Sequence, residues 1–159
     1  MEYRIRVLEE KDNPVIERII RNCLTEYGAA HEGTAWADPM LGCFSEVYAK
    51  EGDCYWVAED RAGAVVGGVG IGYMTGTDGV CELQKMYCIP SARGTGVAAE
   101  LLKTAVAFAK ERYKRVYLET LDNMLRAQRF YEKHGFALTD EVIGNTGHFN
   151  CQVKYILDL

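Results

Sequence analysis

The chain has 159 residues, a formal net charge of -5 at pH 7, 48% hydrophobic residues and 26% charged residues. This length suits one domain with a substantial core, so we expect a single domain over residues 1–159. The composition argues against disordered and fibrous classes, and the negative net charge argues against a nucleic-acid partner held by a broad basic surface.

Neither a membrane segment nor a metal site is expected. Residues 1–7 alternate and carry charge, unlike a secretory signal, and no apolar stretch approaches the roughly 20 residues that cross a bilayer. We therefore expect a cytoplasmic protein with no membrane partner. The six cysteines lack a C-x-x-C pair, which disfavours a zinc site or a dithiol redox motif and favours reduced, mostly buried thiols.

The first half of the chain predicts two helices and four strands. Alternation predicts a strand over residues 3–7, and helical spacing of apolar residues predicts a helix from Pro14, with Asn13 as its cap and Gly28 as its stop. A second, short helix is expected from Asp38 to Tyr48. Further strands are expected over residues 54–59, 64–73 and 81–89, the first two as an antiparallel hairpin and the last ended by Pro90.

The second half predicts a long amphipathic helix followed by alternating elements. The expected elements are a helix over residues 94–113, a strand over 115–119, a helix over 123–133, and strands over 136–139 and 149–157. This order combines antiparallel hairpins with one parallel crossover. The sequence therefore predicts a mixed α/β (α+β) fold.

A glycine-containing turn joins the strand that ends at Pro90 to the long helix. Glycine at 94 and 96 permits backbone angles that other residues resist, and leaves the backbone amides open to a ligand. The amides at the positive end of a helix bind phosphate, and the side chain of Arg93 could add a charged contact. The turn therefore predicts a phosphate-binding loop.

Two other interpretations of this turn stay open from the hexapeptide alone. Gly94-x-Gly96-x-x-Ala99 also satisfies the dinucleotide-binding fingerprint of an oxidoreductase, with Glu119 near the place of the ribose-binding acid. However, only about 40 residues remain downstream, too few for the β-α units that such a domain needs. The turn could also bind nothing.

Two longer segments carry a resemblance to a known family. Residues 83–98 resemble the acetyl-CoA segment of the GNAT (Gcn5-related N-acetyltransferase) superfamily, and residues 118–136 resemble its second cofactor segment. The resemblance covers nearly the whole chain and implies the acyl-CoA N-acyltransferase fold, a central mixed, mostly antiparallel sheet flanked by helices. It implies acetyl-CoA as cosubstrate, a primary amine on a small molecule or peptide as acceptor, and a possible homodimer.

The resemblance also implies roles for individual residues. Backbone groups around Tyr87, at Met86 and Cys88, would hold the pantetheine arm as an added strand does. Asn123 would reach the pantetheine or thioester, and Tyr131 would face the thioester sulfur. The pyrophosphate would be received by Arg93, Gly94, Thr95, Gly96, Val97 and Ala98.

Acetyl transfer needs a group that removes a proton from the acceptor, because an alkyl amine with a pKa of roughly 10.4 is mostly protonated near neutrality. Glu82 is the candidate general base, and its alternative is an exposed strand-end carboxylate. Glu119 is the next candidate, or a residue of the cavity rim. Tyr131 is the candidate general acid for the leaving thiolate, or a ring packed in the core.

The acceptor site is less well marked. Trp36 and Glu119 could bind an amine, and His148 could contact it or act as a base, although Trp36 could equally pack under a loop and His148 hold a loop by hydrogen bonds. A covalent acetyl-Cys88 intermediate is disfavoured, because a strand cysteine is usually a small hydrophobe. We expect an N-acetyltransferase that works by direct transfer in a ternary complex; a non-catalytic acyl-CoA sensor is the alternative.

Overall fold

The computed structural model describes residues 2–141, 143 and 153–159. The helices are α1 (Asn13–Glu26), α2 (Phe44–Val47), α3 (Val97–Lys110) and α4 (Leu125–Lys133), with short 3-10 turns η1 (Glu10–Asp12), η2 (Ala35–Ala37) and η3 (Pro90–Ala92). The strands are β1 (Arg4–Val7), β2 (Cys54–Glu59), β3 (Val65–Tyr73), β4 (Val80–Cys88), β5 (Arg115–Thr120), β6 (Ala137–Leu138) and β7 (Val153–Asp158).

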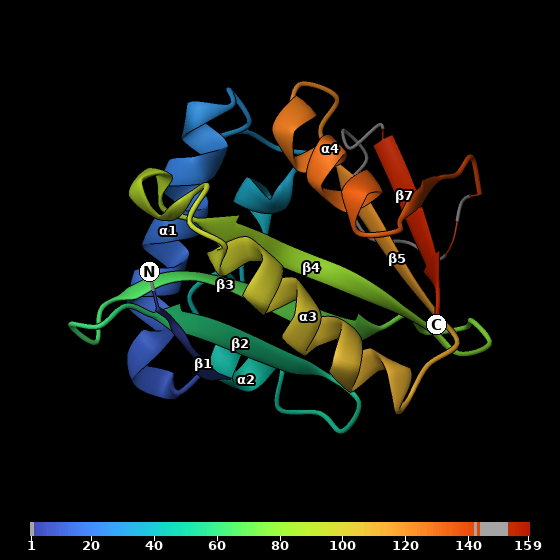
Figure 1. The fold of residues 1–159 in the computed structure, drawn as a ribbon, viewed down its shortest axis with the longest axis horizontal. Helices are drawn as coiled ribbons and strands as arrows, with labels where there is room; N and C mark the ends of the chain where they lie inside the picture. Colours follow the sequence, from blue (N-terminus) through green and yellow to red (C-terminus); the bar gives the residue numbers. More distant parts are fainter. Residues whose placement is uncertain (1, 142, 144–152) are drawn as a thin grey trace.

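The strands form one seven-stranded sheet in the order β1-β2-β3-β4-β5-β7-β6 (Figure 1). Among the described strands β4 and β5 make the single parallel pair, and the other neighbours are antiparallel. α3 connects these two strands in the chain, so the three elements form a β-α-β unit. The predicted mixed α/β class is confirmed, and this topology excludes the doubly wound dinucleotide-binding alternative.

The sheet separates two hydrophobic cores. Alternate residues of β2 belong to each: Trp56 and Ala58 pack in the core under α3, whereas Tyr55 and Val57 pack in the core with α1. Figure 1 shows α3 crossing one face of the sheet, with α1 and α2 behind it. The apolar stripe of each helix is thus buried against one face of the sheet.

Several element boundaries differ from the sequence prediction. The helix expected from Gly94 begins at Val97, because Gly94 and Gly96 have φ of 75° and 93°. The helix expected from Asn123 begins at Leu125 and the short helix expected from Asp38 is limited to Phe44–Val47. Residues 149–152 of the last expected strand lie outside the described residues.

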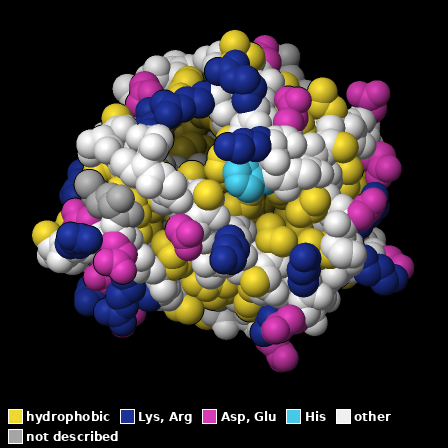
Figure 2. Space-filling view, in the orientation of Figure 1, with side chains coloured by type: hydrophobic (Ala, Val, Ile, Leu, Met, Phe, Trp, Pro, Cys, Tyr) yellow, Lys and Arg dark blue, Asp and Glu magenta, His cyan; other side chains and the backbone are white. Residues whose placement is uncertain are grey.

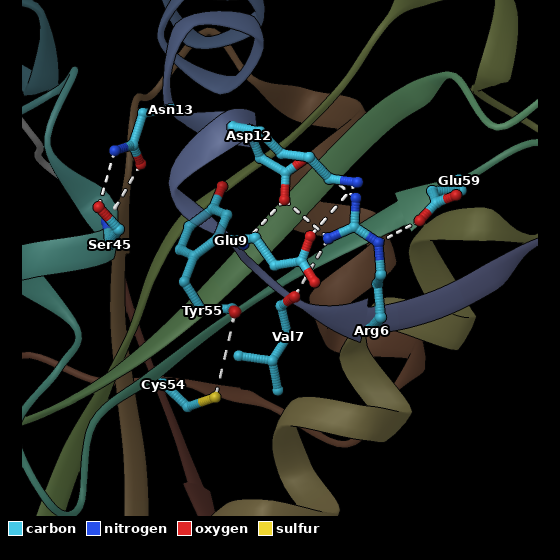
Figure 3. Close-up of polar contacts among 10 residues, drawn as sticks. Arg6, Val7, Glu9, Asp12, Asn13, Ser45, Cys54, Tyr55 and Glu59 are labelled. Carbon is cyan, nitrogen blue, oxygen red and sulfur yellow. Dashed lines mark hydrogen bonds and ion pairs between the residues drawn. The ribbon is translucent and has the colours of Figure 1, made fainter.

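Polar contacts join the start of α1 to the sheet and to α2 (Figure 3). The Arg6 guanidinium donates to Asp12 at 2.7 and 2.9 Å and also to Glu59, which links β1, η1 and β2. Asn13 was expected as the cap of α1 but is its first helical residue. Its side-chain amide instead donates to the Ser45 hydroxyl at 2.8 Å and accepts from the Ser45 backbone N–H at 3.1 Å. These contacts fix α2 against α1.

The glycines of β3 leave room for aromatic rings. A Cβ placed on Gly68 would lie 2.5 Å from Cε1 of Tyr55 and 2.9 Å from the Trp56 carbonyl oxygen, and one placed on Gly70 would lie 2.8 Å from the Tyr48 ring. These separations are far below van der Waals contact. Absence of a side chain is therefore a packing requirement at both positions.

The substitution Gly68→Ala should lower the free energy of unfolding by about 1–3 kcal/mol, because the added methyl overlaps a buried ring and backbone. Gly42→Ala is the matched control, since the atoms that its Cβ would meet are the flexible end of Glu17. Urea unfolding monitored by circular dichroism measures both. Equal losses in the two variants would contradict the packing argument.

Candidate functional site

A cavity opens where two neighbouring strands separate. β4 and β5 pair only over residues 80–82 and 115–117, and beyond Glu82 they diverge. A cavity of about 450 Å³ lies there, lined by β4, β5, the end of α1, the start of α3, α4 and the loop at Thr34 and Ala35. Figure 2 shows a hollow in this face, between α1 and α4 of Figure 1, with a hydrophobic interior and Lys and Arg side chains around its opening.

One end of the cavity is the turn into α3. Gly94 and Gly96 have positive φ, and both line the cavity with Val97, Ala98 and Ala99. The first helical hydrogen bond runs from the Glu100 amide to the Gly96 carbonyl, so the preceding amides of α3 have no partner within the helix. These amides and the helix dipole create a site suited to a phosphate group.

The side chains near this turn differ from expectation. The Arg93 guanidinium donates to Glu26 at 2.7 Å, to the Cys88 carbonyl at 3.2 Å and to Cys23 Sγ at 3.4 Å, so it joins the turn to α1. Arg126, from α4, lies beside the phosphate loop: its Nη2 would be 3.2 Å from a Cβ on Gly94. Arg126 therefore brings a positive charge to the turn that the sequence analysis missed.

Glu82 lies at the point where the strands diverge. It is 7% exposed and lines the cavity. Burial raises the pKa of its carboxyl to about 7, while a hydrogen bond from Gln84 and the charge of Lys85 lower this pKa and the charge of Glu119 raises it. Gln84 Nε2 donates to Glu82 Oε1 at 2.7 Å. A buried carboxylate with a pKa in this range is suited to accept a proton near neutral pH.

A β-bulge follows Glu82 in β4. The register with β3 shifts between Gly68 and Gly70, and Lys85 has φ of 50°, in the left-handed region. The Tyr55 hydroxyl donates to the Lys85 carbonyl at 2.8 Å and so holds the bulge. The Lys85 side chain is 9% exposed, lines the cavity, and has its Nζ 3.5 Å from Asp38 Oδ2.

Tyr131 faces the cavity from α4. Its ring packs against Phe130, Phe136 and Tyr155, with centroid distances of 5.6, 5.7 and 6.2 Å. Its hydroxyl has no hydrogen-bond partner among the described residues. The hydroxyl oxygen is not fully enclosed by protein, so it is open to a ligand. Burial raises the pKa of this phenol, which keeps it protonated at neutral pH.

The remaining predicted residues fall into three groups. Glu119, Met86, Tyr87 and Cys88 line the cavity, and Tyr117 donates to Glu119 at 2.8 Å. Three residues are absent from the lining: Trp36 stacks under Arg21, the Thr95 hydroxyl bonds Tyr3 and the Ala92 carbonyl, and Asn123 donates to the Tyr27 carbonyl at 2.9 Å. His148 lies outside the described residues.

Several lining residues escaped the sequence analysis, among them four with long polar or charged side chains. Gln84 and Lys85 follow Glu82 on β4, and Arg126 and Lys133 come from α4. The glycines of the neighbouring strand β3 indicate that bulky side chains pack over it. This signal could have identified Gln84, whose cross-strand partner is Gly70. The sequence carries no local signal for Arg126, because its place beside Gly94 comes from the packing of α4.

Within the part of the chain that the structure describes, no helix is long and apolar enough to span a bilayer. No cluster of three or more His, Cys, Asp or Glu side chains suited to a metal ion occurs among those residues either.

Burial of Glu82 predicts a dependence of stability on pH. Its folded-state pKa of about 7 lies above the ordinary value of 4.5, so the unfolded chain ionises first and stability falls as pH rises from about 4.5 to 7. Glu82→Gln should therefore raise the free energy of unfolding at pH 8 by about 1–3 kcal/mol and leave it unchanged near pH 4. Urea unfolding at both pH values measures this, with exposed Glu51→Gln as control; equal effects at the two pH values would contradict it.

Comparison with known proteins identifies the family of the chain. The family described as "Acetyltransferase (GNAT) family" matches residues 16–136. An Escherichia coli K12 protein named "Uncharacterized N-acetyltransferase YjgM" is 44% identical over 158 residues, which are 98% of this chain and 94% of that protein.

Solved structures show the same architecture. A GNAT-family acetyltransferase from Staphylococcus aureus Mu50 superposes with a TM-score of 0.88 at 20% identity, over 99% of both chains. The putative acetyltransferase yncA from Salmonella typhimurium, solved with acetyl-CoA, superposes with a TM-score of 0.77 at 20% identity over 100% of this chain and 95% of that one. The resemblance stated from residues 83–98 and 118–136 is confirmed, and the chain belongs to the acetyltransferase (GNAT) family.

Proposed function

We propose that this N-acetyltransferase moves the acetyl group of acetyl-CoA directly to a primary amine in a ternary complex, with Glu82 as general base and Tyr131 as general acid. The observation that carries the proposal is that both side chains line one cavity, which also contains the amino end of α3. A proton acceptor, a proton donor and a phosphate site thus share one space.

The residues at the α3 end fit the diphosphate of coenzyme A. Amides of residues 96–99 supply donors, the two glycines leave them uncovered, and Arg126 brings positive charge beside Gly94. We assign the diphosphate to the backbone of residues 93–98. Arg93 belongs to this loop, but its guanidinium is engaged by Glu26 on α1 and its backbone N–H donates to the Pro90 carbonyl at 3.2 Å, so the donors come from the residues that follow it.

The edge of β4 beyond Glu82 fits the pantetheine arm. That edge loses its parallel partner where β5 diverges, so main-chain groups around Met86 are open to an extended ligand. The Cys88 carbonyl is less available, since it accepts hydrogen bonds from Arg93 and Cys23. We therefore propose Met86 and Tyr87 as the main contacts of the arm.

The proton steps follow from the placement of the two titratable groups. Glu82 accepts one proton from the acceptor ammonium, and the neutral amine then attacks the carbonyl carbon of the thioester. As the bond between that carbon and sulfur breaks, Tyr131 donates its proton to the sulfur. The nitrogen releases its second proton as the amide forms, and exchange with solvent restores both side chains, so one proton is released in each turnover.

The thiol of Cys88 is a poor nucleophile in this setting. Burial raises its pKa to about 12, and no described residue provides a base for it. This supports direct transfer over an acetyl-cysteine intermediate.

The acceptor enters at the Glu82 end in this proposal. Glu82 and Glu119 line that part of the cavity, and negative charge attracts an ammonium group. Lys85 is held by Asp38 and supplies the one cationic group on this part of β4. Small-molecule and peptide amines both remain within the proposal.

The central prediction concerns turnover and its dependence on pH. Release of coenzyme A thiol from acetyl-CoA, measured across a panel of small amines and peptides, should reveal at least one accepted amine. With that amine at saturation, kcat should rise with pH to a plateau, with a midpoint near 7 where Glu82 loses its proton.

Substitutions at the two proposed catalytic residues should act on kcat. Glu82→Gln should lower kcat by about 10²-fold or more and abolish the rise of kcat near pH 7, the limb of the pH profile. Tyr131→Phe should lower kcat by about 10²-fold and keep this limb. Coenzyme A binding without thiol release for every acceptor would instead favour a non-catalytic sensor. An unchanged limb in Glu82→Gln would reject Glu82 as the base.

Arg126 provides a separate test of the phosphate site. Arg126→Ala should weaken binding of coenzyme A by about tenfold, because a charged contact to a phosphate is lost. Arg129→Ala is the matched control, since Arg129 is an exposed residue of the same helix and does not line the cavity. Calorimetric titration with coenzyme A measures both, and equal affinities for the two variants would place the phosphates elsewhere.

A further inference from the structure

A chain of hydrogen bonds reaches Glu82 from outside the cavity. The Tyr48 hydroxyl donates to Gln84 Oε1 at 2.7 Å, and Gln84 Nε2 donates to Glu82 Oε1 at 2.7 Å. The ionised Glu82 carboxylate can only accept hydrogen bonds, so the Gln84 amide turns its NH₂ toward Glu82 and its oxygen toward the Tyr48 phenol, which donates to it. The chain is therefore directional, with each donor pointing toward Glu82.

The fold leaves a dedicated space for this chain. Gly70 is the cross-strand partner of Gln84, and Gly72 is that of Glu82. A Cβ on Gly70 would lie 2.8 Å from Cε1, Cζ and the hydroxyl oxygen of Tyr48, and one on Gly72 would lie 3.0 Å from the Gln84 amide. Tyr48 and Gln84 thus occupy volume that side chains on β3 would otherwise fill.

Tyr48 is itself held firmly. It follows α2, and its ring packs edge-on against Phe44 at a centroid distance of 5.3 Å and against Tyr55 at 5.2 Å. The Asn13–Ser45 hydrogen bonds of Figure 3 fix α2 to α1. Burial raises the pKa of Tyr48 well above 10, so the phenol stays a donor at neutral pH.

We propose that Gln84 and Tyr48 are positioning residues of the general base: they hold Oε1 of Glu82 as a hydrogen-bond acceptor and leave its second oxygen to take the proton from the acceptor amine. This inference rests on the function proposed above. It adds two residues that act through Glu82 and not on the substrates.

The charged groups around Glu82 show why the hydrogen bond from Gln84 matters. Lys85 lies on the same strand and is balanced by Asp38, while Glu119 on β5 carries the same charge as Glu82. Tyr117, opposite Glu82 on β5, donates to Glu119. Gln84 is thus the hydrogen-bond donor that favours ionised Glu82 against burial. Without it, Glu82 should hold its proton to higher pH.

The test is a titration of Glu82 that needs no acceptor. The carboxyl carbon of ¹³C-labelled glutamate is followed by NMR in the free protein, and the Glu82 signal is assigned by its absence in Glu82→Gln. The midpoint should lie near pH 7 in the wild type. It should rise by about one pH unit in Gln84→Met, a tenfold change in the ionisation constant, and by less in Tyr48→Phe.

Tyr113→Phe is the matched control for the loss of a phenol. Its hydroxyl donates to the Gly52 carbonyl at 2.6 Å, away from the cavity, so its midpoint should equal that of the wild type. Equal midpoints in Gln84→Met and the wild type would overturn the inference, even where Tyr48→Phe or Gln84→Met is less stable, because the titration reports only on folded protein.

Kinetics separate this inference from the proposed function. The limb of kcat near pH 7 should move upward with the NMR midpoint in Gln84→Met and Tyr48→Phe, while the KM for acetyl-CoA stays unchanged. An NMR shift without movement of the limb would reject Glu82 as the base. A limb that disappears in Glu82→Gln but does not move in either variant would leave the base in place and reject the positioning role.

Discussion

The separation of β4 from β5 is the constraint on which the cavity depends. The two strands share only three residue pairs, but each is secured on its other side: β4 by β3, and β5 by six antiparallel pairs with β7. The sheet can therefore open between β4 and β5 while each strand keeps its hydrogen bonds to its other neighbour. Main-chain groups on the opened strands need partners, and water or a ligand in the cavity supplies them. The same opening brings Glu82 to the cavity.

Burial of Glu82 lowers the stability of the folded chain and makes its carboxylate a stronger base. A carboxylate in this position destabilises the folded chain above neutral pH, and the same desolvation raises its pKa to about 7, where it can accept a proton from an amine. The two cores on either side of the sheet, under α3 and around α1, offset this cost through buried apolar area. A fully exposed carboxylate would avoid the cost and would be a weaker base. The free energy gained by burial in the two cores thus compensates for the cost of burying Glu82.

Regular elements were predictable from the sequence, and the details of the site were not. The sequence placed β2 and β5 to within one residue: β2 alternates between the two cores, and Val116 and Leu118 of β5 pack in the core under α3 while Tyr117 faces the other way. Alternation also places Glu82 and Lys85 on opposite faces, yet the bulge changes the register, and both side chains line one cavity. A bulge depends on the pairing of two strands, and one strand's pattern cannot reveal it. Arg126 was missed for the same reason, since its neighbour Gly94 is distant in the chain.

The glycines of β3 show how a weak local signal can carry structural meaning. A glycine inside a strand costs roughly 0.5–1 kcal/mol relative to alanine, so four of them, at positions 67, 68, 70 and 72, oppose strand formation. Tyr55, Tyr48 and Gln84 occupy the space above three of these positions. Ring packing and hydrogen bonds there compensate for the lost strand propensity. The strand is therefore weak in isolation and stable only with its aromatic neighbours, and this couples correct folding of β3 to the arrangement of the residues around Glu82.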